Sequence, residues 1–218
     1  MPFSHTAPRI EFNELEDEIQ CLRDKERKDL ESDLYGNSER SIETETLRVS
    51  SLEELQMELN FLESTTLDTK VYQQALQQCP AYATSESFLL SFLRAEDFHV
   101  QNAAQRLVSY WNEKRKLFGE EHTYSQITLN SLQETDLKVI KNGGFTLLPN
   151  DDHGRIVLHR DRIACQVKLR GRESVLRAFL YLVHVAIDND DTAQQKGMVI
   201  LSASRYAFQL EDHDRLYM

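Results

Sequence analysis

The side chains that most often carry out chemistry in proteins occur in this chain, but their spacing does not assemble a site. Seven histidines are present, and none lies in the zinc-binding pattern HExxH. No serine occupies the GxSxG pattern of a nucleophile, and the three cysteines have no CxxC spacing. Adjacent acidic pairs such as Glu120-Glu121 lie in polar stretches typical of solvated surface. The sequence therefore predicts no catalytic residues, no metal site and no cofactor.

One short motif matches part of a known catalytic sequence. The tripeptide His159-Arg160-Asp161 matches the catalytic HRD of protein kinases, in which the aspartate serves as base. A kinase has an asparagine five residues after that aspartate, whereas this chain has Gln166. The sequence also lacks a DFG motif and a glycine-rich loop, and the tripeptide lies in an apparent strand. We therefore predict that the protein is not an enzyme.

The charge is unevenly distributed along the chain. The formal net charge is −11, and residues 11–63 hold 17 acidic but only 6 basic side chains. Residues 155–177 are locally basic, which favours an anionic partner. Their basic side chains are Arg155, Arg160, Arg162, Lys168, Arg170, Arg172 and Arg177. Solvated surface and contact with a phosphate or lipid headgroup both remain open. Nucleic acid is disfavoured, because the pI is acidic and no stacking aromatics interleave with these charges.

A nearly continuous apolar helix is predicted at residues 173–187. Leu176, Phe179, Leu180 and Val183 follow i, i+3, i+4, i+7 spacing and share one face, and the opposite face is apolar too. A helix that is apolar nearly all round is buried on more than one side. Pure core packing and the lining of a lipid cavity both explain this pattern.

Other elements position this helix. Residues 87–115, SFLLSFLRAEDFHVQNAAQRLVSYWNEKR, predict two amphipathic helices with a break at residues 96–99. Residues 114–116 lie in the predicted last turn, where basic side chains oppose the negative end of the helix dipole. Upstream, a disordered linker is expected at residues 35–50 and a helix from Ser51, whose capping box includes Glu54.

The second half of the chain predicts strands around one helix. Strands are expected at residues 145–148 and 155–163, joined by a turn-rich segment, and at residues 198–201 after the apolar helix. The last strand, MVIL, is a continuous apolar run typical of a strand that is covered on both faces. The order β-β-α-β begins an α/β layer architecture.

The order of these motifs resembles the CRAL-TRIO lipid-binding family. FLLSFLRAEDFHVQNAA resembles the family text FLLRFLRARKFDVEKA, and GRIVLHR, beginning at Gly154, resembles GRRVLLLR. ESVLRAFLYLVHVAI then resembles a helix of the type DLFRALFLLLEEL, and an acidic loop, a glycine and a buried strand follow. The resemblance spans residues 68–218. It implies an N-terminal helical module followed by the first half of an α/β lipid-binding domain.

The resemblance also implies a function and a set of site residues. Members of the family bind one phosphoinositide, other phospholipid or isoprenoid-type molecule in an apolar pocket and move it between membranes. The expected pocket residues are Leu176, Phe179, Leu180, Val183, Ile200 and Ser202. The arginine of FLRA, Arg94, is the expected contact for a headgroup phosphate. The expected partners are a lipid ligand and, transiently, a membrane surface, and the expected location is cytoplasmic or peripheral on membranes.

The expected domains are an acidic, partly disordered segment at residues 1–65, a helical module at 66–119 and an incomplete lipid-binding domain at 120–218, which ends near the middle of the family's domain. An alternative function is a non-enzymatic interaction protein with a degenerate lipid-binding domain. It is motivated by Glu96, where the family often has a basic residue, and by Ala203, where the family usually has an aspartate. In that case the predicted helix at residues 11–34 recruits a protein partner.

Overall fold

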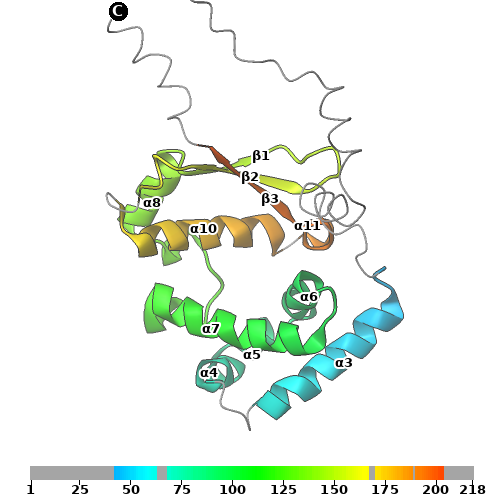
Figure 1. The fold of residues 1–218 in the computed structure, drawn as a ribbon. Helices are drawn as coiled ribbons and strands as arrows, with labels where there is room; N and C mark the ends of the chain where they lie inside the picture. Colours follow the sequence, from blue (N-terminus) through cyan, green and yellow to red (C-terminus); the bar gives the residue numbers. More distant parts are fainter. Residues whose placement is uncertain (1–41, 63–67, 167–169, 189, 204–218) are drawn as a thin grey trace, which may run out of the picture. The chain divides into compact units, whose positions relative to one another are not determined.

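The computed structural model describes residues 42–62, 68–166, 170–188 and 190–203. The predicted partner-recruiting helix at residues 11–34 lies outside these ranges. By its internal contacts the chain divides between Ile42 and Glu43, and the elements described below belong to the unit Glu43–Met218. In this unit a set of helices precedes a small sheet with its own helices (Figure 1). The predicted combination of helices and a sheet is therefore confirmed at this coarse level.

The first part of the unit is helical. Its elements are α3 (Glu45–Leu62), α4 (Lys70–Gln78), α5 (Pro80–Ala83), α6 (Glu86–Ala95) and α7 (Val100–Thr123). The predicted break between the helices α6 and α7 is confirmed, and Asp97 and Phe98 adopt positive φ angles of 50° and 62° there. The hydrophobic core of this part contains fully buried side chains, among them Leu93, Leu107 and Trp111.

Helix α3 begins earlier than predicted. Thr44 precedes its first turn, and the Thr44 hydroxyl accepts a hydrogen bond of 3.2 Å from the amide of Leu47. The prediction of a linker up to residue 50 and a helix start at Ser51 is therefore wrong for the described residues. Leu55 and Leu59 are buried in the core shared with α6 and α7. The packing of these leucines holds α3 in the same unit as the later helices, and residues 45–50 alone do not indicate it.

Helix α7 also extends further than its charge pattern indicated. It continues to Thr123 across a kink at Gly119, whose φ of 69° lies in the left-handed region that glycine tolerates. The segment before the kink therefore ends within about two residues of the predicted last turn at residues 114–116, and α7 resumes after Gly119. Lys114 is only 1% exposed, so this lysine is a buried side chain of the helix interior and not a solvated cation at a helix end.

The second part contains a three-stranded sheet of β1 (Phe145–Leu148), β2 (Ile156–Asp161) and β3 (Met198–Ala203) in the order β1-β2-β3. β1 and β2 pair antiparallel, with Phe145 opposite Arg160, whereas β2 and β3 pair parallel, with Leu158 opposite Ile200. The parallel pair needs a crossover connection, which includes α10 (Arg172–Ile187) and α11 (Asp191–Lys196). A 3₁₀ helix (Leu129–Ser131) and α8 (Glu134–Lys141) precede the sheet. The predicted order β-β-α-β is confirmed.

Strand β3 is less covered than its sequence indicates. Ile200 and Leu201 are 49% and 48% exposed, although their apolar run predicted a strand covered on both faces. Successive side chains of a strand point to opposite faces of the sheet, so the exposure of these two neighbours leaves both faces of β3 partly uncovered by the described residues. The prediction of two covered faces is therefore wrong for the described structure.

Helix α10 packs against the sheet on one side and against α7 on another (Figure 1). Val175, Ala178 and Leu182 are buried in a core shared with Phe145 and Leu158 of the sheet. The prediction of burial on more than one side holds for the middle of the helix. It fails at Leu176 and Val185, which are 36% and 54% exposed.

Candidate ligand pocket

A pocket of about 400 Å³ lies between α6, α7 and α10. Each helix lines it with one face, in steps of three and four residues. The contributions are Phe88, Ser91, Phe92 and Ala95 from α6; Arg106, Ser109, Tyr110, Glu113 and Lys114 from α7; and Leu180, Val183, His184 and Ile187 from α10, with Asp188 just beyond it. The faces of α6 and α10 are mainly apolar, whereas that of α7 is mainly polar. The pocket is therefore amphipathic.

Lys114 lies in a box of aromatic rings. Its Nζ atom is 4.9 Å from the ring centroid of Trp111, 5.0 Å from that of Tyr82 and 5.8 Å from that of Tyr110. It also donates a hydrogen bond of 2.5 Å to the carbonyl oxygen of Ser125. Burial lowers the pKa of Lys114 to about 8, against the weaker opposing effect of Cys79 and Asp188. The ring faces favour the charged form, so the box partly offsets the loss of hydration.

A chain of hydrogen bonds crosses from α10 to α7 and α5. The imidazole of His184 contacts the Asp188 carboxylate through Nδ1, at 2.8 and 2.9 Å. Its Nε2 lies 3.1 Å from the hydroxyl of Tyr110, which lies 3.3 Å from the hydroxyl of Tyr82. Burial raises the pKa values of both tyrosines, so the two hydroxyls stay protonated well above neutral pH. This chain fixes one end of the pocket by linking α10 to the helical part.

The structure brings two of the predicted pocket residues on α10 into this pocket. Leu180 and Val183 line it together with residues of α6 and α7. Phe179 faces the sheet instead, and its ring centroid lies 5.6 Å from that of Phe145. Leu176 is 36% exposed. The predicted single lining face is therefore divided between a pocket side, a sheet side and an exposed side.

The predicted pocket residues of the last strand lie elsewhere. Ile200 and Ser202 are on β3, and both side chains are exposed. Neither is among the residues that line the pocket between α6, α7 and α10. Their contact with a ligand stays a prediction.

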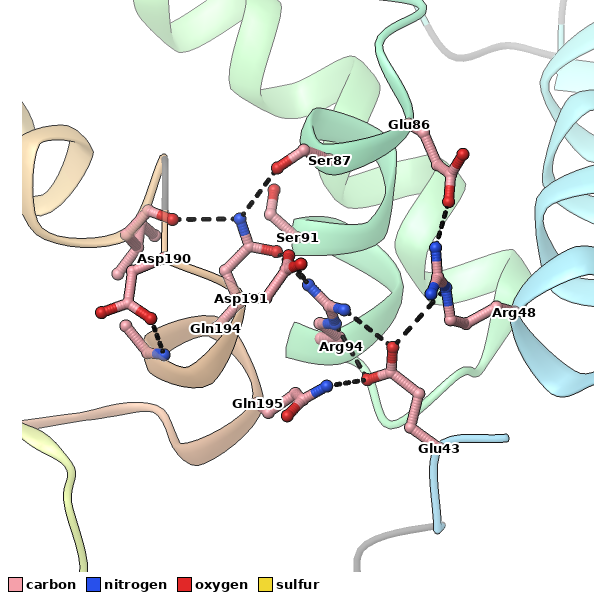
Figure 2. A network of polar contacts seen from close by, with 12 residues as sticks. Glu43, Arg48, Glu86, Ser87, Ser91, Arg94, Asp190, Asp191, Gln194 and Gln195 are labelled. Carbon is pink, nitrogen blue, oxygen red and sulfur yellow. Dashed lines mark hydrogen bonds and ion pairs between the residues drawn. The ribbon is translucent and has the colours of Figure 1, made fainter. Parts of the chain in front are cut away.

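Arg94, the predicted headgroup contact, lies at the centre of a network of polar contacts (Figure 2). Its guanidinium donates to both carboxylate oxygens of Glu43, at 2.9 and 2.7 Å. On the opposite side it donates to Asp191 at 2.8 Å and to the side-chain carbonyl of Gln194 at 2.6 Å. A phosphate at Arg94 would have to displace these groups. The observed role of Arg94 is to join the start of the unit, α6 and α11.

Other predicted basic contacts are also engaged. Arg155 donates to Asp151 at 2.6 Å, and the buried Arg177 forms two hydrogen bonds with Asp136, at 2.8 and 3.0 Å. Residues 167–169, within the same basic stretch, lie outside the described residues. The two partnered arginines contribute to local structure, which leaves fewer free charges for an anionic partner than the sequence count indicated.

Sequence reasoning missed Lys114 and the His184–Asp188 pair. The signals were present as i, i+4 spacings: Tyr110 with Lys114 on α7, and His184 with Asp188 at the end of α10. Such spacings are common on solvated helices, and only the packing of α10 against α7 distinguishes these two pairs.

No family model matches the chain, and no curated protein matches it either. Among the described residues, no helix combines the length and the apolar character needed to cross a membrane. Within the same ranges, no three histidine, cysteine, aspartate or glutamate side chains gather to form a candidate metal site.

The buried ammonium of Lys114 leads to a test of stability. We expect Lys114→Met to raise the free energy of unfolding at pH 7 by about 1–3 kcal/mol, because a depressed lysine pKa corresponds to roughly 3 kcal/mol of unfavourable burial that the ring contacts partly offset. The unfolded chain holds the lysine proton up to about pH 10.4, whereas the folded chain loses it near pH 8. The gain should therefore be greatest below pH 8 and fade above it.

Denaturant unfolding at pH 7 and pH 9.5 measures this difference. Lys116→Met is the matched control, because the Lys116 side chain is 70% exposed and forms an ion pair with Glu113 on the same helix. A substitution at Lys114 that destabilises the protein equally at both pH values would contradict the expectation. Tyr82, Tyr110, Cys79 and Asp188 are present in both proteins, so their own titration cancels to first order in the comparison.

Proposed function

We propose that the protein binds a lipid or similar hydrophobic ligand in the pocket between α6, α7 and α10 and moves it between membranes. The observation that carries this proposal is the amphipathic pocket itself, which three helices line with continuous faces. Its volume of about 400 Å³ falls in the usual range for small-molecule sites. The resemblance of residues 68–218 to the CRAL-TRIO family supports the same class of ligand.

The energetics favour an acyl or isoprenoid chain. Each methylene group transferred from water into an apolar site contributes about 0.8 kcal/mol. Phe88 and Phe92 of α6 and Leu180, Val183 and Ile187 of α10 supply the apolar surface for such a chain. Access to a membrane from the cytoplasm and peripheral contact with it are part of this proposal.

A protein-interaction role is the alternative. It is favoured by β3, on which Ile200 and Leu201 are each about half exposed in the described structure. An apolar strand at the end of a sheet offers both backbone groups and side chains to another chain. A folded protein that carries no lipid and takes up none would favour this alternative over lipid binding.

The test of the proposal fills the pocket. Val183→Trp places a large ring in the space between α10 and α6, and we expect the lipid bound per protein to fall at least about tenfold, since the ring occupies the volume of the ligand. The measurement is mass spectrometry of lipid extracted from the purified protein, together with uptake from vesicles that contain a fluorescent phospholipid. Unchanged lipid content in a folded Val183→Trp protein would contradict the proposal.

The matched control is Val185→Trp. Val185 lies two residues further along α10, is 54% exposed and does not line this pocket, so its substitution should leave the lipid content unchanged. Melting temperatures of both variants separate a blocked pocket from an unfolded protein. Loss of lipid from both variants at unchanged melting temperatures would place the ligand outside the pocket between α6, α7 and α10.

A further inference from the structure

The pocket has one buried positive charge without a carboxylate partner. Lys114 forms part of its wall and is 1% exposed. Within the described ranges, no carboxylate lies within ion-pair distance of its Nζ atom, whose hydrogen bond goes to the neutral carbonyl of Ser125. An ammonium has three donors and is strongly hydrated in water, so a buried one retains capacity for an anion.

The other charged groups on the wall are already paired. Arg106 donates to Glu96, Glu113 forms an ion pair with Lys116, and the carboxylate of Asp188 contacts the imidazole of His184. The positive charge still without a carboxylate on this wall is therefore that of Lys114. The Lys114 side chain lines the pocket from the polar face of α7, and its ammonium lies against Tyr82, Trp111 and the Ser125 carbonyl, which do not line the pocket.

We propose that this pocket takes a long-chain monocarboxylate, with the apolar chain against α6 and α10 and the carboxylate at the ammonium of Lys114. The inference rests on the proposed function and specifies its ligand class. The flexible four-carbon stem of lysine allows the ammonium to turn from the Ser125 carbonyl to the head group. One negative charge matches the one free positive charge, whereas a phosphate monoester carries about −1.5 to −2 and needs more donors than this wall offers.

The aromatic box gives this binding a built-in readout. Trp111 is the single tryptophan of the chain, and its ring centroid lies 4.9 Å from Nζ. A carboxylate that draws the ammonium away from the ring changes the surroundings of the indole. Trp111 fluorescence of the lipid-free full chain, titrated with decanoate, decanol and decyl phosphate, therefore reports occupancy for three probes that share one apolar chain.

We expect decanoate to bind about tenfold more tightly than decanol, as a charge-assisted hydrogen bond in a buried site implies. Decyl phosphate should bind more weakly than decanoate. Lys114→Met should make the affinities for decanoate and decanol equal, and the affinity for decanol should not fall. Lys141→Met, which removes the same charge from an exposed position on α8 that does not line the pocket, should leave all three affinities unchanged.

Four other results of these titrations would each contradict part or all of the two proposals. Equal affinity of the unsubstituted protein for decanoate and decanol would overturn the carboxylate inference and leave the lipid-binding proposal standing. Tighter binding of decyl phosphate than of decanoate would indicate that the ligand's head group is a phosphate and not a carboxylate. A decanoate preference that persists in Lys114→Met would assign the anion to another residue. If none of the three probes binds and the protein also takes up no lipid from vesicles, both proposals are overturned.

Discussion

Asp136→Ala is expected to lower the free energy of unfolding by about 3–5 kcal/mol, the usual effect of removing one partner of a buried ion pair. Asp136 is fully buried and accepts two hydrogen bonds from Arg177, at 2.8 and 3.0 Å. It also accepts a hydrogen bond of 2.9 Å from the amide of Gln133 and thereby caps α8. Without it, the guanidinium of Arg177 stays buried between α8 and α10 with only neutral acceptors or the distant Glu173 beside it.

The same pair sets an acid limit on stability. Burial raises the pKa of Asp136, but the hydrogen bonds from Arg177 and Gln133 outweigh it, and the pKa lies below its ordinary value of 3.8. A depressed carboxylate pKa stabilises the folded state above the unfolded pKa. This contribution is therefore complete above about pH 4 and is lost as the pH falls further.

Denaturant unfolding at pH 7 checks the size of the effect. Glu134→Ala is the control on the same helix, because Glu134 is exposed and forms a surface pair with Lys138, so its loss should cost at most about 0.5 kcal/mol. The double variant Asp136→Ala, Arg177→Met should recover part of the loss, since it removes the uncompensated charge as well. An Asp136→Ala protein as stable as the Glu134→Ala protein would contradict the burial and pairing seen here.

Arg94→Met is expected to lower the free energy of unfolding by about 3 kcal/mol, because it removes charge-assisted hydrogen bonds to two carboxylates and leaves the largely buried Glu43 without its main partner. The Arg94 hydrogen bond is the main reason why the pKa of Glu43 lies below 4.5. The loss should therefore be complete above about pH 4.5 and shrink as the pH falls and Glu43 takes up a proton.

The control for Arg94 is Arg48→Met. Arg48 pairs with Glu86 and Glu45 in the same region, but its side chain is 32% exposed, so its loss should have a much smaller effect. Lipid content measured on the same two variants addresses the predicted headgroup role of Arg94. A variant at Arg94 with unchanged stability and a lost phospholipid would favour the headgroup role over the structural one.

Elements with strong local signals were predictable. The turn-rich segment between residues 148 and 156 fixed the β1–β2 hairpin, and the apolar run of α10 fixed that helix to within one residue at each end. The start of α3 was missed, because residues 35–50 are mostly polar and the buried leucines further along the helix stabilise its first turns. The exposure of β3 was missed because an apolar run indicates a strand but not what covers each of its two faces.

The candidate pocket was also predictable only where the local sequence pattern determined which residues share a helix face. The i, i+3, i+4, i+7 pattern placed Leu180 and Val183 together on α10, and the structure puts both in the pocket. The pattern could not tell that Phe179 would face the sheet, since both faces of α10 are apolar. Lys114 was assigned to a helix end because basic residues usually occupy last turns, and its burial depends on Tyr82, which lies 32 positions earlier in the chain.

The contacts of Arg94 also couple segments that lie far apart along the chain. Its partners lie 51 positions before it, at Glu43, and 97 positions after it, at Asp191. Until α11 docks, the guanidinium on α6 is hydrated on the side where Asp191 and Gln194 will lie, and docking exchanges this water for the two acceptors. The contact between α6 and α11 therefore couples the two parts of this unit, and we expect them to unfold in a single cooperative transition.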